Sequence, residues 1–407
     1  MKRRTVLQQI ALFTGGLIIP LSSNSWVSKG LSKNPSQKKL IVVFLRGAID
    51  GLNVVIPYQE DEYYHNRPNI AILPPNEPNG VLDLDGYFGL NPALKDLMPL
   101  WKKKQLTFIH GCGLENENRS HFEVQHYMEN GTPGNLKNDE GWMNRLLGIL
   151  SSKNPTQAVN IGSVTPEILR GSIPVANLPR EKDNLQKLST DIPIVNKLFN
   201  ELYNGNDSLS LAYQEGQKAR KIFIKEFEHE MVESSKNAPS TSNFVQEVKK
   251  MAKLMSGEAN TQLGFIDLGQ WDTHINQSAQ LNRLLMPLGE GLATLALELG
   301  NLFNDTTIIV MSEFGRTVKE NGNKGTDHGS GNLMWILGGN INGGKFYGQW
   351  NTLEKKALFE GRDIPITTDF RQPISNILST NFDLSPQLIN QVFPNFNSKN
   401  NLNFISV

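Results

Sequence analysis

Short apolar runs rich in β-branched residues are the feature of this 407-residue sequence that most limits its fold. Such runs are typical of strands buried on both faces of a parallel sheet. They lie at 40–45, 106–110, 158–162, 264–268, 306–311 and 333–338. Segments with helical periodicity lie between them, at 92–101, 120–130, 211–235, 243–255 and 277–303. Strands alternating with helices predict an α/β fold, in which helices sandwich a mostly parallel sheet.

Charge balance and cysteine content exclude several classes of function and of metal site. The sequence has 40 Lys and Arg residues and 40 Asp and Glu residues. It therefore lacks the basic excess on which nucleic-acid binding depends, and we expect no nucleic-acid partner. Cys112 is the only cysteine, which excludes an intramolecular disulfide framework and a cysteine-ligated zinc cluster. Any metal ion must then be bound by histidines and carboxylates.

The first 30 residues are typical of an export signal. Three basic residues at 2–4 precede an uncharged stretch from 10 to 25, whose apolar core of about a dozen residues is too short to span a bilayer. The Arg3–Arg4 pair resembles a twin-arginine signal, which is recognised by the export machinery for folded proteins. We expect a periplasmic or secreted protein. Because no A-x-A cleavage site follows Leu21, the segment is either removed or kept as a membrane anchor.

The remaining chain is predicted to form one domain, from about residue 38 to 400. Residues 183–257 are charged and helical and lack a strong strand pattern, so we interpret them as a helical insertion over the sheet. Pro287 lies inside the long helical segment 277–303 and predicts a kink or a break there.

The loops after the predicted strands contain the candidate site residues, because ligands bind outside the carboxyl ends of parallel strands. These loops carry Asp50, Ser120, His121, Asp272, His274, Glu313, Arg316, Asp327 and His328. Carboxylates that meet in a partly dry cleft must bind a proton or a cation. Oxygen and imidazole donors without thiolate suit Zn, Mn, Mg, Ca or Fe, and the sequence does not choose between these ions.

Eight blocks between about Leu40 and Gln372 carry a family resemblance. They are FLRGAIDGLNVVIPY, YFGLNPALKDLMPLW, RSHFEVQHYMENGTPG, GWMNRLL, GQWDTH, MSEFGRT, TDHGSGN and TTDFRQ. Together they resemble the DUF1501 family, exported bacterial proteins whose fold resembles the alkaline phosphatase and sulfatase superfamily. The resemblance implies an alkaline phosphatase-like sheet, whereas the family name records an unknown function.

The resemblance also implies roles for individual residues. In the superfamily, a first-strand Asp, a loop Ser or Thr nucleophile, an Asp-and-His pair, a later acidic-His pair and a distal His hold one or two metal ions. The matching positions here are Asp50, Ser120, Asp272 with His274, and His328.

Two positions depart from the superfamily pattern. Phe314 follows Glu313 where a histidine ligand is expected, which puts a second metal ion in doubt. Asp327 and His328 would restore an acid-histidine pair, although they follow a loop instead of a strand. The spacing Asp272-x-His274 is also shorter than the Asp-x-x-x-His of many relatives, so this pair needs a loop or extended backbone to reach one ion.

These observations lead us to expect an exported metal-dependent hydrolase of phosphate or sulfate esters. Its substrate would be a small anionic ester or a sulfated or phosphorylated glycan. Ser120 would attack as alkoxide, with His121 beside it and Arg119 or Arg316 stabilising the negative charge. Alternatively, a metal-bound hydroxide attacks and Ser120 is a bystander. The expected metal ligands are Asp50, Asp272, His274, Glu313, Asp327 and His328.

Structural explanations remain open for the same residues. They are an Asx turn at Asp50, a capping box of Ser120 with Glu123, a hydrogen-bonded pair of Asp272 with His274, and an internal salt bridge of Glu313 with Arg316. A second hypothesis for the whole protein is a non-catalytic secreted protein that retains the cleft for a metal ion or another ligand. Phe314 favours this second hypothesis.

Overall fold

The computed structural model describes residues 38–115, 119–135, 137–150, 154–162, 164–180, 193–218, 243–259, 261–398 and 402–405. The expected export signal at 1–30 lies outside the described residues. Much of the expected insertion at 183–257, including most of the predicted helix 211–235, also lies outside them.

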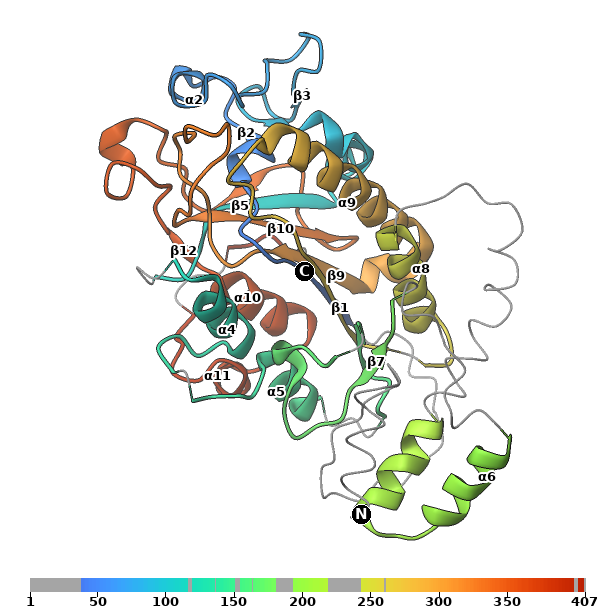
Figure 1. The fold of residues 1–407 in the computed structure, drawn as a ribbon. Coiled ribbons are helices and arrows are strands. Elements are labelled where there is room, and N and C mark those ends of the chain that lie inside the picture. Colours follow the sequence, from blue (N-terminus) through green and yellow to red (C-terminus); the bar gives the residue numbers. More distant parts are fainter. Residues whose placement is uncertain are drawn as a thin grey trace, which may run out of the picture.

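A mostly parallel sheet forms the centre of the molecule (Figure 1). Its strands follow the order β11-β5-β10-β9-β1-β8-β6-β7, and β12 pairs with β5. The strands are β1 (Lys39–Leu45), β5 (Leu106–Gly113), β6 (Ala158–Ile161), β7 (Ala176–Leu178), β8 (Leu263–Leu268), β9 (Thr306–Met311), β10 (Asn332–Gly338), β11 (Phe346–Tyr347) and β12 (Thr368–Asp369). The six predicted strands are all confirmed.

Strand β1 lies at the centre of the sheet and is buried on both faces. Side chains alternate along a strand, and Ile41, Val43 and Leu45 pack into one hydrophobic cluster. Leu40, Val42 and Phe44 pack into a second cluster on the opposite face. This explains why the run has no polar alternation: each face of the strand is covered by a helical layer.

One helical layer contains α8 (Asn243–Ser256), α9 (Gln277–Leu299), α3 (Met98–Lys102) and the short 3-10 helices η2 (Pro92–Leu97) and η6 (Gly300–Asp305). The other contains α4 (His121–Asn130), α5 (Trp142–Ile149), α10 (Arg371–Asn381) and α11 (Pro386–Val392). Figure 1 shows the two layers on opposite sides of the sheet. The predicted α/β sandwich is therefore confirmed.

Two local sequence signals had different outcomes. Gly131 follows α4 in the left-handed region with φ 67°, which is typical of a glycine that ends a helix, and the helix ends at Asn130, as the predicted segment 120–130 does. In contrast, α9 continues through Pro287 as one helix, so the alternative of a break at this proline is wrong.

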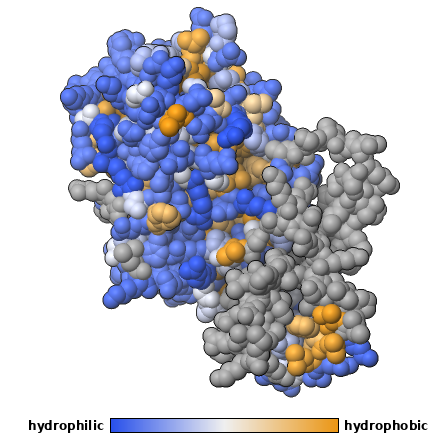
Figure 2. Space-filling model, in the orientation of Figure 1, coloured by the Kyte–Doolittle hydropathy of each residue, from blue (hydrophilic) through white to orange (hydrophobic). Residues whose placement is uncertain are grey.

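The remaining elements lie around this sandwich. A small second sheet consists of β2 (Val55–Ile56), β4 (Gly89–Leu90) and β3 (Leu82–Asp83). The other short elements are α2 (Asp61–Asn66), α6 (Pro193–Leu202), and the 3-10 helices η1 (Gly51–Asn53), η3 (Glu167–Leu169) and η7 (Lys355–Ala357). Figure 2 shows a mostly hydrophilic face, with an apolar patch over α6 where Leu198 and Leu202 are exposed. Within the described ranges, no helix has both the length and the apolar character that a membrane span requires.

The direction of the strands determines where the loops meet. Strands β1, β8 and β9 are parallel neighbours, and β10 runs antiparallel to both β9 and β5. The carboxyl ends of β1, β5, β8 and β9 therefore share one rim of the sheet with the amino end of β10. This is why a residue that precedes β10 reaches the same place as residues that follow the other strands.

Candidate metal centre

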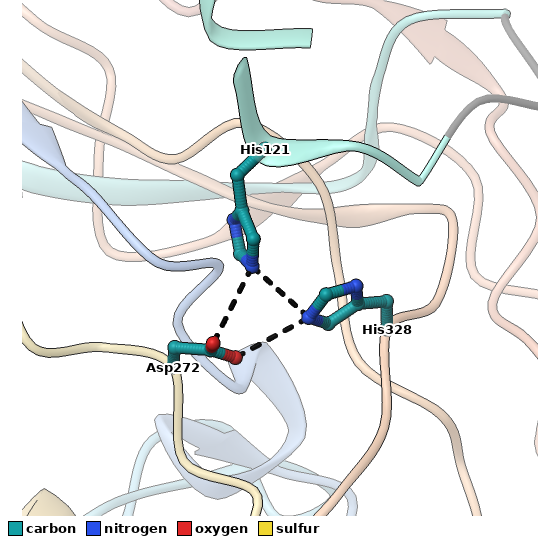
Figure 3. Close-up of side chains that lie close together, drawn as sticks. All are labelled: His121, Asp272 and His328. Carbon is teal, nitrogen blue, oxygen red and sulfur yellow. Dashed lines mark hydrogen bonds and ion pairs between the residues drawn. The ribbon is translucent and has the colours of Figure 1, made fainter. Parts of the chain in front are cut away.

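His121, Asp272 and His328 converge at this rim, with one donor atom of each within 4.8 Å of the others (Figure 3), and His274 lies beside His328 and Asp272. His121 is the first residue of α4, Asp272 and His274 lie between β8 and α9, and His328 precedes β10. His328 Nε2 lies 3.0 Å from His121 Nε2, 3.0 Å from His274 Nε2 and 3.3 Å from Asp272 Oδ1. Asp272 Oδ1 is also 3.0 Å from His274 Nε2, and its Oδ2 is 3.6 Å from His121 Nε2.

The Nδ1 atom of each imidazole faces an oxygen that can accept a hydrogen bond but cannot donate one. His121 Nδ1 lies 2.7 Å from Glu313 Oε1, and His274 Nδ1 lies 3.2 Å from Asp327 Oδ1. His328 Nδ1 lies 3.1 Å from the carbonyl oxygen of Arg119. Each Nδ1 must therefore carry a hydrogen and donate it, which assigns the tautomer of the neutral ring. In that tautomer, the lone pair of each ring is on Nε2.

This arrangement brings the Nε2 lone pairs of His121 and His328 and the Asp272 carboxylate within 4.8 Å of one another, and the His274 lone pair lies beside His328 and Asp272. Lone pairs about 3 Å apart repel each other unless a proton or a cation lies between them, and one proton on His328 Nε2 would satisfy only one of its neighbours. Atoms that bind a common ion at about 2.1 Å lie roughly 3.0 to 3.4 Å apart in octahedral or tetrahedral geometry. The donor set thus fits a divalent metal ion, and histidines with oxygen-bonded Nδ1 atoms are typical of metal ligands.

Asp272 is held in place by Arg316, which lies under it. Arg316 Nη2 donates to Asp272 Oδ1 at 2.6 Å. Burial raises the pKa of Asp272, but the hydrogen bond and charge of Arg316, together with the neighbouring histidines, lower it overall. The carboxylate therefore stays ionised and available to a cation.

Arg316 does not have the position expected of a catalytic residue. Its side chain has no exposed surface, and its other donors bind carbonyl oxygens of Gly47, Ala48, Trp271 and Thr326. A buried guanidinium enclosed by carbonyls cannot contact a bound ester. The expected role of Arg316 in stabilising substrate charge is therefore wrong for this geometry, and the expected salt bridge goes to Asp272 instead of Glu313.

Glu313 lies beside the cluster and contacts a ring of it. Its Oε1 accepts hydrogen bonds from His121 Nδ1, from Gln125 Nε2 at 2.8 Å and from the Gly47 amide at 2.8 Å. Its Oε2 accepts from Ser312 Oγ at 3.0 Å. Burial raises the pKa of Glu313, but the hydrogen bonds from His121 and Gln125 lower it below the ordinary value. Both oxygens of Glu313 thus already accept hydrogen bonds, and one of them contacts the His121 ring.

Asp50 is placed in a different network from the expected one. Its carboxylate forms a bidentate ion pair with Arg67, at 2.5 and 3.1 Å, in which neither side chain has more than 1% exposed surface. Gln277 Nε2 donates to Oδ2 at 2.5 Å, and the Leu52 amide donates to Oδ1 at 3.2 Å, which is the Asx turn. Because a permanent cation already neutralises it, the expectation of Asp50 as a metal ligand is not met.

Asp327 supports His274 from the solvent side. It is 59% exposed, and it accepts a hydrogen bond from Asn321 Nδ2 as well as from His274. The hydrogen bond from Asn321 is the main cause that lowers the pKa of Asp327, with His274 adding to it. Like Glu313, Asp327 accepts a hydrogen bond from the Nδ1 atom of a histidine at the site.

Ser120 and Arg119 lie immediately before His121. Ser120 is the exposed N-cap residue of α4, but its side chain caps no amide of this helix. Glu123 accepts a hydrogen bond from Tyr127 Oη. The Arg119 guanidinium binds Glu360 at 2.9 Å and Asp363 at 3.0 Å, and 31% of its side chain is exposed.

Phe314 covers one side of the cluster. Its ring centroid lies 4.8 Å from that of His121 and 5.0 Å from that of His328, and only 4% of the residue is exposed. The residue that departs from the superfamily pattern thus packs against two of the candidate ligands. Burial is the main cause that lowers the pKa of His328, and the charges of His121 and Arg316 add to it.

The sequence did not identify the residues that hold the site together. Arg67, in the loop after α2, and Gln277, the first residue of α9, contact Asp50, whereas Gln125 in α4 contacts Glu313. They have no motif of their own. The only available signal was the need of a buried acid for a partner, which does not say where that partner lies in the sequence.

Comparisons with known proteins complete the description. A family model with the description "Protein of unknown function (DUF1501)" matches residues 106–393. No curated protein matches the chain. One similar solved structure is titled "Crystal structure of Ps i-CgsB in complex with k-i-k-neocarrahexaose"; it has 11% identity and a TM-score of 0.40, and the match covers 87% of this chain and 74% of that one. Another is the C-terminal periplasmic domain of EcEptC from Escherichia coli in complex with Zn, with 9% identity, a TM-score of 0.38, and coverage of 79% and 77%.

Proposed function

We propose that this chain, which belongs to the DUF1501 family, is an exported metal-dependent hydrolase of phosphate or sulfate esters. The proposal includes an alkaline phosphatase-like and sulfatase-like ancestry of the sheet, and export through the twin-arginine machinery by the segment 1–30. The substrate would be a small anionic ester or a sulfated or phosphorylated glycan. The ion would be Zn, Mn, Mg or Ca, and the imidazole donors favour Zn over the other three.

One observation carries the proposal: the Nε2 lone pairs of His121 and His328 and the Asp272 carboxylate meet at a rim that solvent reaches, with His274 beside them. The side chains are 22% exposed at His121, 25% at His328, 38% at His274 and 43% at Asp272. Structural metal sites are closed by protein ligands, whereas catalytic sites keep a position open to substrate. This partly exposed set matches the second kind.

Different residues of the chain would have different roles in ester hydrolysis. When bound, the ion would polarise the ester oxygen and favour the ionised form of a hydroxyl near it. Ser120 stands at the N-terminus of α4, where the helix dipole favours an oxyanion, and it would supply the nucleophilic oxygen. Arg119 is the arginine left to bind the ester anion, because Arg316 is enclosed. Glu313 and Asp327 would hold His121 and His274 in the required tautomer.

The test measures metal content and ester hydrolysis in parallel. The purified chain is assayed with aryl phosphate and aryl sulfate before chelation, after chelation and after addition of Zn²⁺ or Mn²⁺. We expect activity that chelator abolishes and metal restores, and that Asp272→Ala abolishes. Asp305→Ala is the control, because Asp305 pairs with Lys38 at the start of β9, the opposite end of that strand from the site.

A second candidate function is metal or ligand binding without catalysis. Phe314 favours it, since its ring lies on two candidate ligands where another donor would assist catalysis. Tight metal binding with no turnover of either ester class would support this second function and contradict the first.

A further inference from the structure

We infer that the centre holds a single metal ion, and that the Arg67–Asp50 ion pair and Phe314 leave no donor set for a second one. The inference rests on the metal binding in the proposed function and goes beyond it. The number of ions limits the chemistry, because two-ion sites stabilise attacking and leaving oxygens together, whereas a one-ion site leaves one of them to the protein.

The first argument is the count of available donors. Among the described residues at this rim, the carboxylates outside the cluster already have partners. Glu313 accepts four hydrogen bonds from Gly47, His121, Gln125 and Ser312. Asp327 accepts from His274 and Asn321. A second ion would have to displace these donors, including those that fix two of the ligand rings.

The second argument is the charge of Arg67. Its five N–H groups bind the carbonyls of Val318 and Thr317, Asn53 Oδ1 and both oxygens of Asp50, at 2.5 to 3.1 Å. The side chain has no exposed surface. A guanidinium is always charged, so this place beside the site already contains a cation. A metal ion at Asp50 would have to expel it, leaving an unpaired buried charge.

The third argument is the position of Phe314. Its ring packs on the rings of His121 and His328, so the side of the cluster that it covers presents carbon instead of a donor atom. Phe314 therefore offers no donor atom to a second ion on the side of the cluster that it covers.

The Arg67–Asp50 pair also connects to the loops that carry the candidate ligands. Gln277 Nε2 donates to Asp50, and Gln277 Oε1 accepts from Thr273 Oγ1 at 2.9 Å and from Thr326 Oγ1 at 2.6 Å. Thr273 lies between Asp272 and His274, and Thr326 lies two residues before His328. The pair is thus linked through one amide to both loops that carry ligands, and Asp50 and Arg67 act as positioning residues.

The experiment is a metal titration of the full mature chain. Co²⁺ binding is followed by its visible absorbance, and bound Zn²⁺ or Mn²⁺ is counted by elemental analysis after desalting. We expect saturation at one equivalent per chain. Two equivalents would overturn the inference and leave the proposed hydrolase intact. No binding by the folded protein would overturn both, whereas one equivalent without ester turnover would support the inference and contradict the hydrolase.

A matched pair of variants separates the two acids. Asp272→Asn should weaken Co²⁺ binding by at least about tenfold, since it removes a ligand charge. Asp50→Asn should still saturate at one equivalent, but with lower Co²⁺ affinity, because Asp50 positions both ligand loops through Gln277. Circular dichroism is the check on folding. A fall in the number of bound ions caused by Asp50→Asn alone would make Asp50 a ligand and overturn the inference. If this variant does not fold, the stoichiometry of the unmodified chain decides the question.

Discussion

His121 Nδ1 lies 2.7 Å from the Oε1 atom of Glu313, a carboxylate with no exposed surface. The contact joins the partly exposed His121 ring to a fully buried acid. It determines which nitrogen of the ring faces the cluster. Metal-ligating histidines generally have such an acceptor, and its loss weakens metal binding or activity.

Glu313→Gln should therefore reduce metal affinity by roughly 10- to 100-fold, because the neutral amide is a weaker acceptor for the His121 N–H. Competition between the protein and a chromogenic chelator for Zn²⁺ measures the effect. Asp327→Asn is the comparison: this acceptor is 59% exposed, so the loss should be smaller. Equal effects, or none at Glu313, would contradict the orienting role.

Ser120→Ala separates a nucleophile from a bystander. If Ser120 forms the covalent intermediate, the variant should lose at least about 10³-fold in kcat, as removal of a nucleophile does in other hydrolases. Metal content should not change, because Ser120 is outside the donor set. Steady-state kinetics on an aryl phosphate give the answer. Near-normal turnover would show that another oxygen attacks.

Arg67→Met should destabilise the fold by about 3–5 kcal/mol, because it leaves Asp50 charged and buried without its partner. The double variant Asp50→Asn/Arg67→Met should recover part of this loss. Urea unfolding followed by tryptophan fluorescence measures both. A single-variant loss below about 1 kcal/mol would mean that the pair contributes little and that the carboxylate finds another partner.

His110 predicts an acid sensitivity that is independent of the metal centre. It is packed among Phe88, Phe346 and Trp350, and burial lowers its pKa from 6.5 to about 3. Since the unfolded chain binds the proton first, the stability that neutral His110 provides is complete above pH 6.5 and is lost as the pH falls from 6.5 toward 3.

His110→Phe should therefore flatten the pH dependence of unfolding in the metal-free protein. The difference between variant and unmodified chain should change by about 2 kcal/mol between pH 7 and pH 5. Urea titrations at several pH values measure it. His65→Asn, at an exposed position, is the control and should leave the slope unchanged. A parallel slope in His110→Phe would contradict the prediction.

The strands were predictable because their patterns are local. The continuous apolar run 306–311 predicts β9, which the structure places at Thr306–Met311. The antiparallel direction of β10 was not predictable in this way, since an apolar run has the same pattern in either direction. Its direction depends on pairing with β5 and β9, which lie far apart in the sequence.

The site was predictable as a set of residues but not as a set of roles. Asp272 and Glu313 both follow buried strands, and no local pattern separates them. Their surroundings differ. Asp272 accepts a hydrogen bond from the buried Arg316 and is partly exposed to solvent, whereas Glu313 accepts hydrogen bonds from four donors. Asp50 was assigned to the ion because its partner, Arg67, lies 17 residues away in a loop without a recognisable motif.

The antiparallel pairing of β9 with β10 also has an evolutionary consequence. The connection between these strands leaves and re-enters the sheet at one rim, and its two arms pair through a bridge between Arg316 and His328. A single continuous peptide therefore supplies Glu313, Phe314, Arg316, Asp327 and His328. Such a segment is inherited as a unit, so the candidate donor His328 and the side chains that contact His121, Asp272 and His274 pass together from one generation to the next.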